Sequence, residues 1–144
     1  MSLSAEVEEF LSLRNLAALP QSEAEAITRR ITLPLSLDLM SSYEQGAPTL
    51  DIDDWNRNSG LALRAAHECL ASGTYYLFMS ASPRSFLISI EKEALLALIF
   101  EKNFYFSFAV FSASLADYLF EDHSGFMVAG GVFAPLIEAA RREA

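Results

Sequence analysis

The chain has 144 residues, of which 52% are hydrophobic, and a formal net charge of −9. This length favours one domain over residues 1–144, with a helical part over about residues 1–72 and a sheet-rich part over about residues 73–144. The acidic balance argues against nucleic-acid binding, because proteins that bind phosphate backbones usually carry a basic patch.

Cysteine content and hydropathy bear on the compartment. Cys69 is the only cysteine, so an intrachain disulfide is excluded, which fits a reducing compartment. The acidic N-terminus lacks the apolar core of a signal peptide, and the apolar stretches are too short and too interrupted by charge to span a bilayer. We therefore expect a soluble, cytoplasmic protein with no membrane partner.

The first part of the chain predicts two helices. Residues 4–18 suit a helix, because Ser4 can cap it and glutamates fill its first turns, where the helix dipole favours negative charge. Ser22 and Glu25 form a capping box that predicts a second helix over about residues 23–31.

Residues 31–39 leave two interpretations open. Apolar and polar side chains alternate there with a period of two, which favours a strand, and Pro34 would confine that strand to a sheet edge. A helical continuation to Leu39 is the alternative. Residues 41–51 then predict a turn-rich loop.

A third helix is predicted to begin at a cap of Asp53 or Asp54 and to run to about Ser72, where Gly73 closes it. Apolar side chains share one side of this helix, which is typical of a surface helix packed on a core. Cys69 falls on that side, so we expect its thiol to be buried and inert.

The second half predicts an antiparallel sheet of three to five strands over about residues 74–129, so that the fold class is α+β. The central part is the ribbon 103–131, in which one strand face carries Phe104, Phe106, Phe108 and Val110 and the other carries Tyr105, Ser107, Ala109 and Phe111. The expected strands are residues 74–81, 86–89, 104–111, 115–121 and 126–129, with a helix over residues 91–101 for which a strand pair is the alternative.

The C-terminal segment predicts a closing helix. Gly130 and Gly131 break the last strand, and Pro135 is tolerated only in a first helical turn, so the helix should start near Phe133. A glycine pair before a helix suits either an anion-binding helix N-terminus or a sharp bend, and no phosphate-binding motif surrounds it.

Motifs for catalysis and metal binding are missing from the sequence. His67, Glu68 and Cys69 are consecutive, so on a helix they point in different directions and cannot hold one metal ion. No nucleophile elbow or Ser–His–Asp order is recognisable. We therefore expect no catalytic residues, no metal and no cofactor.

Two acidic clusters are the candidate binding residues. Asp51, Asp53 and Asp54 stand beside Trp55, which suits either a helix cap with a core tryptophan or an acidic rim around an aromatic anchor. The second cluster, in the predicted hairpin loop, consists of Glu121, Asp122 and His123. It suits either an exposed turn or negative charge presented to a partner.

In acidic balance, size and α+β pattern the chain resembles two groups of bacterial proteins, the immunity proteins that neutralise a toxin by binding it and the acidic chaperones of type III secretion. These general features carry the resemblance, and no motif does. The long apolar helix around Trp55 departs from the chaperone pattern.

Two hypotheses about function follow. The first is a non-enzymatic protein-binding module whose negative charge attracts a basic protein partner; a second copy of the chain, forming a homodimer, is the other partner left open. The second is a small-molecule-binding or enzymatic domain with a pocket between the aromatic sheet and its helices. The residues that could line such a pocket are Tyr75, Tyr76, Tyr105 and His123.

Overall fold

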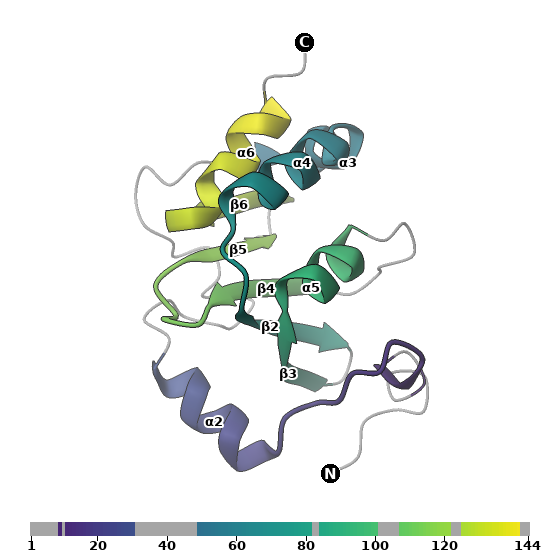
Figure 1. Cartoon of the computed structure of the whole chain (residues 1–144), viewed down its shortest axis with the longest axis vertical. Helices are drawn as coiled ribbons and strands as arrows, with labels where there is room; N and C mark the ends of the chain where they lie inside the picture. Colours follow the sequence, from purple (N-terminus) through teal and green to yellow (C-terminus); the bar gives the residue numbers. More distant parts are fainter. Residues whose placement is uncertain are drawn as a thin grey trace.

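A computed structural model describes residues 9, 11–30, 49–81, 84–100, 107–121 and 125–141 of the chain. The fold class is α+β, as predicted. Its centre is an open antiparallel sheet with the strand order β1-β6-β5-β4-β2-β3 (Figure 1). The chain therefore builds most of the sheet by pairing strands that follow one another, with β1 added at the far edge.

The bounds of the elements are as follows. The strands are β1 Thr49–Asp51, β2 Thr74–Ala81, β3 Arg84–Glu91, β4 Ser107–Ser112, β5 Tyr118–Glu121 and β6 Phe126–Gly130. The helices are α2 Gln21–Arg30, α3 Ile52–Arg57, α4 Ser59–Cys69, α5 Lys92–Ile99, the 3-10 turn η1 Gly131–Phe133 and α6 Ala134–Arg141.

One face of the sheet is covered by α3, α4, α5 and α6 (Figure 1). Leu77, Val110 and Leu119 point into this layer from neighbouring strands, and all three are fully buried. Burial of apolar surface on this scale is the main favourable term in folding. The main hydrophobic core of the described residues lies between this sheet face and the four helices.

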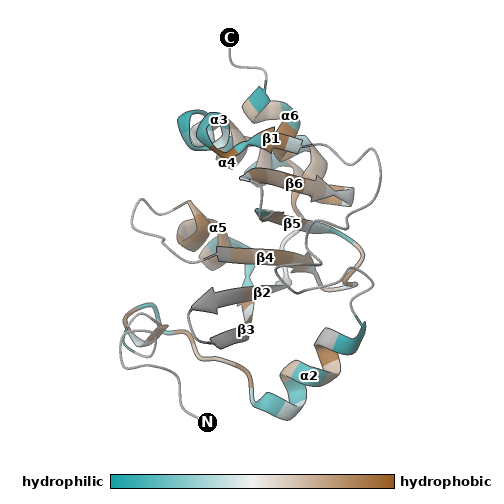
Figure 2. Cartoon of the chain, turned by 180° about the vertical axis from the view of Figure 1, so that it is seen from behind, coloured by the Kyte–Doolittle hydropathy of each residue, from teal (hydrophilic) through white to brown (hydrophobic). Residues whose placement is uncertain are grey.

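The opposite face of the sheet is also apolar. Ala109, Phe111, Phe120 and Val128 are buried there, and Ile27 of α2 packs on the same cluster. In Figure 2, α2 is hydrophilic over much of its surface whereas β4 and β6 are hydrophobic. Both faces of β4 are therefore buried, rather than the single aromatic face that the alternation in residues 104–111 predicts.

The segment before α2 passes around the β3 edge of the sheet. Leu16 packs against the helix-covered side, and Leu19 packs against the opposite side. The backbone N–H of Leu19 also donates a hydrogen bond of 2.8 Å to the carbonyl of Leu87 in β3. This bond protects part of an edge strand that would otherwise present unpaired backbone groups.

The prediction of three to five strands is wrong by one. Five strands follow residue 73, which equals the upper limit of the prediction. The sixth strand is β1, which lies inside the predicted loop 41–51. β1 has three residues and pairs with β6 through Thr49↔Val128, Leu50↔Met127 and Asp51↔Phe126. A strand this short has no periodicity to detect, and only its pairing with a distant strand defines it.

The third helix differs from its prediction at both ends and in the middle. Its cap is Asp51, not Asp53 or Asp54, and the helix is broken at Asn58 into α3 and α4. The Asn58 side chain is buried and donates a hydrogen bond of 2.8 Å to the carbonyl of Ala140 in α6. The Asn58 side chain therefore bonds to α6 and does not cap the N-terminus of α4.

The other predicted helices are confirmed in part. The helix predicted over residues 91–101 is confirmed as α5. The first helix, predicted to reach residue 18, ends near Leu13, because Asn15 adopts a left-handed conformation (φ 59°). The second helix begins at Gln21, so Ser22 lies inside it and does not cap it. The strand predicted over residues 31–39 and the side chains of Phe104 and Phe106 lie outside the described residues.

The glycine pair before the last helix serves as a sharp bend. Gly131 has φ +64°, and the backbone N–H of Val132 donates a hydrogen bond of 3.1 Å to the carboxylate of Asp117. The Asp117 carboxylate therefore takes the place at this helix N-terminus that an external anion would take. Asp117 directly precedes β5, at the opposite end of that strand from Glu121.

Cys69 is exposed, so the prediction of a buried thiol is wrong. The helix ends at Cys69, and Leu70, the next residue, takes the buried position. We expect native protein to react with a thiol reagent as fast as protein unfolded in denaturant. A native reaction many times slower than the unfolded one would contradict this placement.

Candidate functional site

The topology brings the first acidic cluster and Glu121, the described residue of the second, to one end of the sheet. Glu121 ends β5, Phe126 begins β6 and Asp51 ends β1, and these three strands are neighbours in the sheet. Adjacent strands lie about 4.8 Å apart, so the ends of β5 and β1 are roughly 10 Å apart. We call Asp51, Asp53, Asp54 and Phe126 the acidic corner. Glu121 lies at the same end of the sheet, but its side chain is on the opposite face from those of Asp51 and Phe126.

The three aspartates of the acidic corner have different environments. The Asp51 carboxylate accepts a hydrogen bond of 2.8 Å from the backbone N–H of Asp53 and so caps α3. Asp53 is exposed in the first turn of that helix. Asp54 forms an ion pair of 2.8 Å with Arg57, whose own side chain is mostly exposed. Asp51 and Asp53 are therefore the two aspartates of this segment that are exposed and form no ion pair with a described residue.

Trp55 is part of the core, with only 6% of its surface exposed. Its ring stacks on the ring of Phe100 at a centroid distance of 5.8 Å. This environment matches the cap-and-core interpretation of the 51–55 segment, and the Trp55 ring is not presented at the surface.

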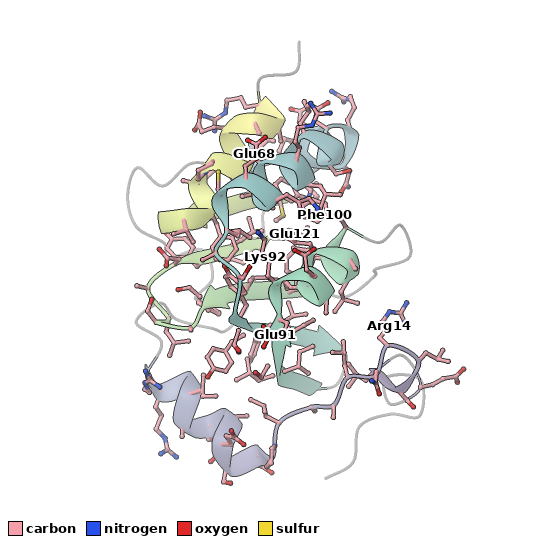
Figure 3. The ribbon with its side chains drawn as sticks, in the orientation of Figure 1. Arg14, Glu68, Glu91, Lys92, Phe100 and Glu121 are labelled. Atoms are coloured by element: carbon pink, nitrogen blue, oxygen red, sulfur yellow. The ribbon has the colours of Figure 1, made fainter. Side chains whose placement is uncertain are left out.

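The hairpin cluster is described only in part. Glu121 is half-buried at the end of β5 and pairs across the sheet with Met127. Since Leu119 points into the helix-covered core, the alternation of the strand puts Glu121 on that same side. Figure 3 shows its label in the middle of the molecule, near Phe100. Asp122 and His123 lie outside the described residues.

Phe126 is the residue of this corner that the sequence argument missed. It is a large hydrophobic side chain with 39% of its surface exposed, and its cross-strand partner is Asp51. The backbone N–H of Ile52 bonds the carbonyl of Gly125 at 2.9 Å, which fastens the start of α3 to the start of β6. An aromatic residue directly after an acidic loop was the available signal.

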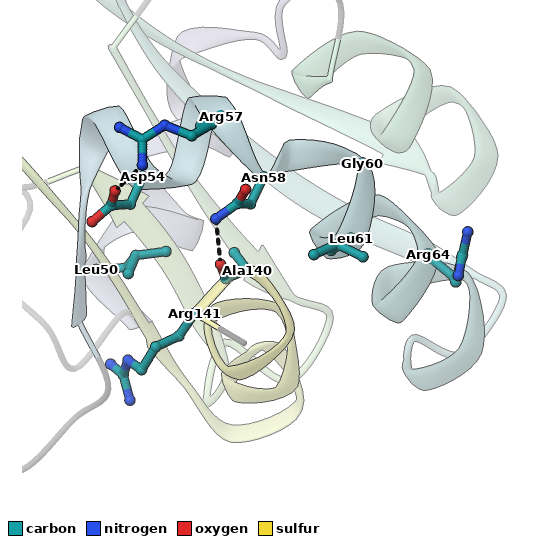
Figure 4. A pocket seen from close by; sticks show the side chains of 9 residues that line it. All are labelled: Leu50, Asp54, Arg57, Asn58, Gly60, Leu61, Arg64, Ala140 and Arg141. Atoms are coloured by element: carbon teal, nitrogen blue, oxygen red, sulfur yellow. Dashed lines mark hydrogen bonds and ion pairs between the residues drawn. The ribbon is translucent and has the colours of Figure 1, made fainter. Parts of the chain in front are cut away.

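A separate pocket of about 680 Å³ lies beside the acidic corner, between α3, the first turns of α4 and the end of α6 (Figure 4). Its lining residues are Leu50, Asp54, Arg57, Asn58, Gly60, Leu61, Arg64, Ala140 and Arg141. The sequence predicts a pocket in a different place, between the sheet and its helices. In the described residues, the space between the sheet and these helices is filled by fully buried side chains such as Leu77, Met127 and Ile137.

The residues expected to line a sheet pocket are placed differently. Tyr75 is buried, and its hydroxyl donates a hydrogen bond of 2.7 Å to the carbonyl of Ala71. Burial, and to a smaller extent the negative charge of Asp117, raise the pKa of Tyr75 above its ordinary value. Tyr76 packs on the opposite face of the sheet, while Tyr105 and His123 lie outside the described residues.

Across the described ranges, no group of three or more His, Cys, Asp or Glu side chains could hold a metal ion. Within the same part of the chain, the helices are too short or too polar to cross a membrane. Comparisons of the chain with protein-family profiles, curated proteins and solved structures found no significant match.

Proposed function

We propose that the chain is a protein-binding module that presents the acidic corner to a basic protein partner. The observation that carries the proposal is the exposed ring of Phe126 directly opposite Asp51 in the sheet, with Asp53 close by on α3. Interfaces typically combine an aromatic anchor with a polar rim. Immunity-type and chaperone-type proteins, which the chain resembles in size and charge, belong to the same functional class.

The charge of the chain supports the same proposal. A formal net charge of −9 attracts a positively charged partner and repels a second copy of the chain. A basic partner is therefore favoured over a homodimer at this surface. Charge complementarity acts mainly on the rate of association, and a buried aromatic anchor acts mainly on the rate of dissociation.

The experiment is affinity capture from the source cells, with wild-type protein compared with Phe126→Ala. Because an anchor residue commonly contributes 2 kcal/mol or more to binding, we expect Phe126→Ala to reduce recovery of the specific partner by about tenfold or more. Quantitative mass spectrometry of the captured proteins measures this ratio.

Val132→Ala is the matched control. Val132 is as exposed as Phe126, 41% against 39%, but it follows the opposite end of β6. Recovery with this variant should equal the wild-type value. A partner lost equally with both variants, or with neither, would remove Phe126 from the interface.

A further inference from the structure

We infer that the pocket between α3, α4 and α6 binds a small organic anion with an apolar body and an acidic group, such as a carboxylate, sulfonate or phosphate. The pocket adjoins the acidic corner and shares Asp54 with it, but this inference does not rest on the protein partner proposed there. Its volume of about 680 Å³ is in the range of small-molecule sites, which run from about 300 to 1,000 Å³.

The first argument is the charge of the lining. Arg57, Arg64 and Arg141 contribute +3 and Asp54 contributes −1, so the nine lining residues carry a formal charge of +2. The whole chain carries −9 and has only ten lysines and arginines. The pocket therefore gathers three of these ten cations in an otherwise acidic molecule, and its charge favours an anionic ligand.

The second argument is the distribution of polar and apolar groups. Leu61, which is half-buried, and the small exposed part of Leu50 supply the apolar surface of the lining, and the amide nitrogen of Asn58 is bonded to the carbonyl of the buried Ala140. In Figure 4 Arg57 and Arg141 lie at one end of the pocket, and Arg64 lies at the other end, further along α4. Apolar side chains between cationic ones fit a ligand that has both an apolar body and an acidic group.

The three arginines are not equivalent. Arg57 is paired with Asp54 at 2.8 Å, and Arg141 bonds both Glu138 and the carbonyl of Thr49. Arg64 forms no hydrogen bond or ion pair with any other described residue, so all its N–H donors are available. A guanidinium presents its donors in a planar fork that matches an oxyanion. Arg64 should therefore contribute most to recognition of the acidic group.

Gly60 lines the pocket in the first turn of α4, and a Cβ atom added there would meet nothing within 4 Å. There is room for a large side chain at this position, and we expect it to occupy the pocket. Gly60→Phe is therefore a blocking variant that leaves every lining arginine in place.

The test uses two fluorescent probes, anilinonaphthalene sulfonate and its uncharged analogue N-phenylnaphthylamine, titrated into the full chain. We expect one saturable site for the sulfonate, and weaker binding of the uncharged probe. Arg64→Glu should weaken sulfonate binding about fivefold or more and leave binding of the uncharged probe nearly unchanged. Gly60→Phe should abolish binding of both probes.

Arg30→Glu is the matched control, because it makes the same charge change on an exposed residue at the end of α2. Circular dichroism and thermal melting establish that each variant is folded. Equal losses for Arg64→Glu and Arg30→Glu would overturn the proposal, since net charge alone would explain them. Equal affinity for the two probes, or no saturable binding in folded wild-type protein, would overturn it as well.

Discussion

Gly130→Ala is expected to destabilise the protein by about 3 kcal/mol, because forcing extra atoms into a packed core costs 1–3 kcal/mol and occasionally more. A Cβ atom at Gly130 would lie 2.4 Å from two ring carbons of Tyr118, its partner in the β5–β6 pairing. That ring is buried on the sheet face that α2 also packs against, so it has little room to move. Urea denaturation followed by circular dichroism measures the loss.

Gly60→Ala is the control for this variant. The same substitution at Gly60 adds a Cβ atom to open space inside a helix, where alanine is favoured over glycine by roughly 0.5–1 kcal/mol. We therefore expect Gly60→Ala to leave stability unchanged or to increase it. Equal effects of the two substitutions would show that the Tyr118 ring does not limit the space at Gly130.

Lys92→Met is expected to cost about 1.5–3 kcal/mol, the range for hydrogen bonds to a charged group. Lys92 is buried, and its ammonium group donates to the carbonyls of His67 and Leu70 at 3.1 and 2.7 Å (Figure 3). These carbonyls belong to the C-terminal end of α4, where the helix dipole also favours a positive charge. Methionine keeps the aliphatic stem but leaves both carbonyls without this donor.

Thermal melting measures this effect, since each 1 kcal/mol shifts the midpoint of a domain of this size by about 2–4 °C. Arg30→Met removes an exposed positive charge at the end of α2 and should shift the midpoint little, because exposed substitutions usually stay within about 0.5 kcal/mol. A Lys92→Met midpoint equal to that of Arg30→Met would contradict the capping role of Lys92.

The sheet was predictable where side-chain alternation and turn residues agree. The strands after residue 73 and the helix α5 follow from such local patterns, and Pro135 correctly indicated where the last helix starts. Local propensity and the tertiary structure favour the same conformation in these segments, which is the consistency expected of a natural sequence.

The differences arise where a long-range contact decides the conformation. The break between α3 and α4 depends on the hydrogen bond from Asn58 to Ala140, 82 positions along the chain. β1 exists only because it pairs with β6. Cys69 is exposed because α4 ends there and Leu70 turns into the core. None of these contacts leaves a pattern in the neighbouring sequence.

The acidic residues of the candidate site were visible in the sequence, but their arrangement was not. The register of β1, β6 and β5 brings Asp51 and Glu121 to one end of the sheet but on opposite faces, and Phe126 is exposed while Trp55 is buried. The sequence favours Trp55 as the anchor because it is adjacent to the aspartates. Which aromatic ring is exposed depends on packing between elements, and packing is decided by the whole fold.

The central claim is that the acidic corner attracts a basic partner, and the most direct test is the association rate with the captured partner as a function of ionic strength. The variant is Asp51→Asn with Asp53→Asn, because asparagine retains the capping oxygen at position 51 while two surface charges are lost. Glu68→Gln with Glu93→Gln, which removes two exposed charges from α4 and α5, is the control.

Exposed charges act over about 8 Å at physiological salt, so attraction should weaken as salt is added. We expect wild-type and control proteins to associate fast at low salt and to slow steeply as ionic strength rises. The Asp51/Asp53 variant should associate more slowly at low salt and depend less on ionic strength, with its dissociation rate nearly unchanged. Salt slopes that are identical for wild type and this variant would contradict the account.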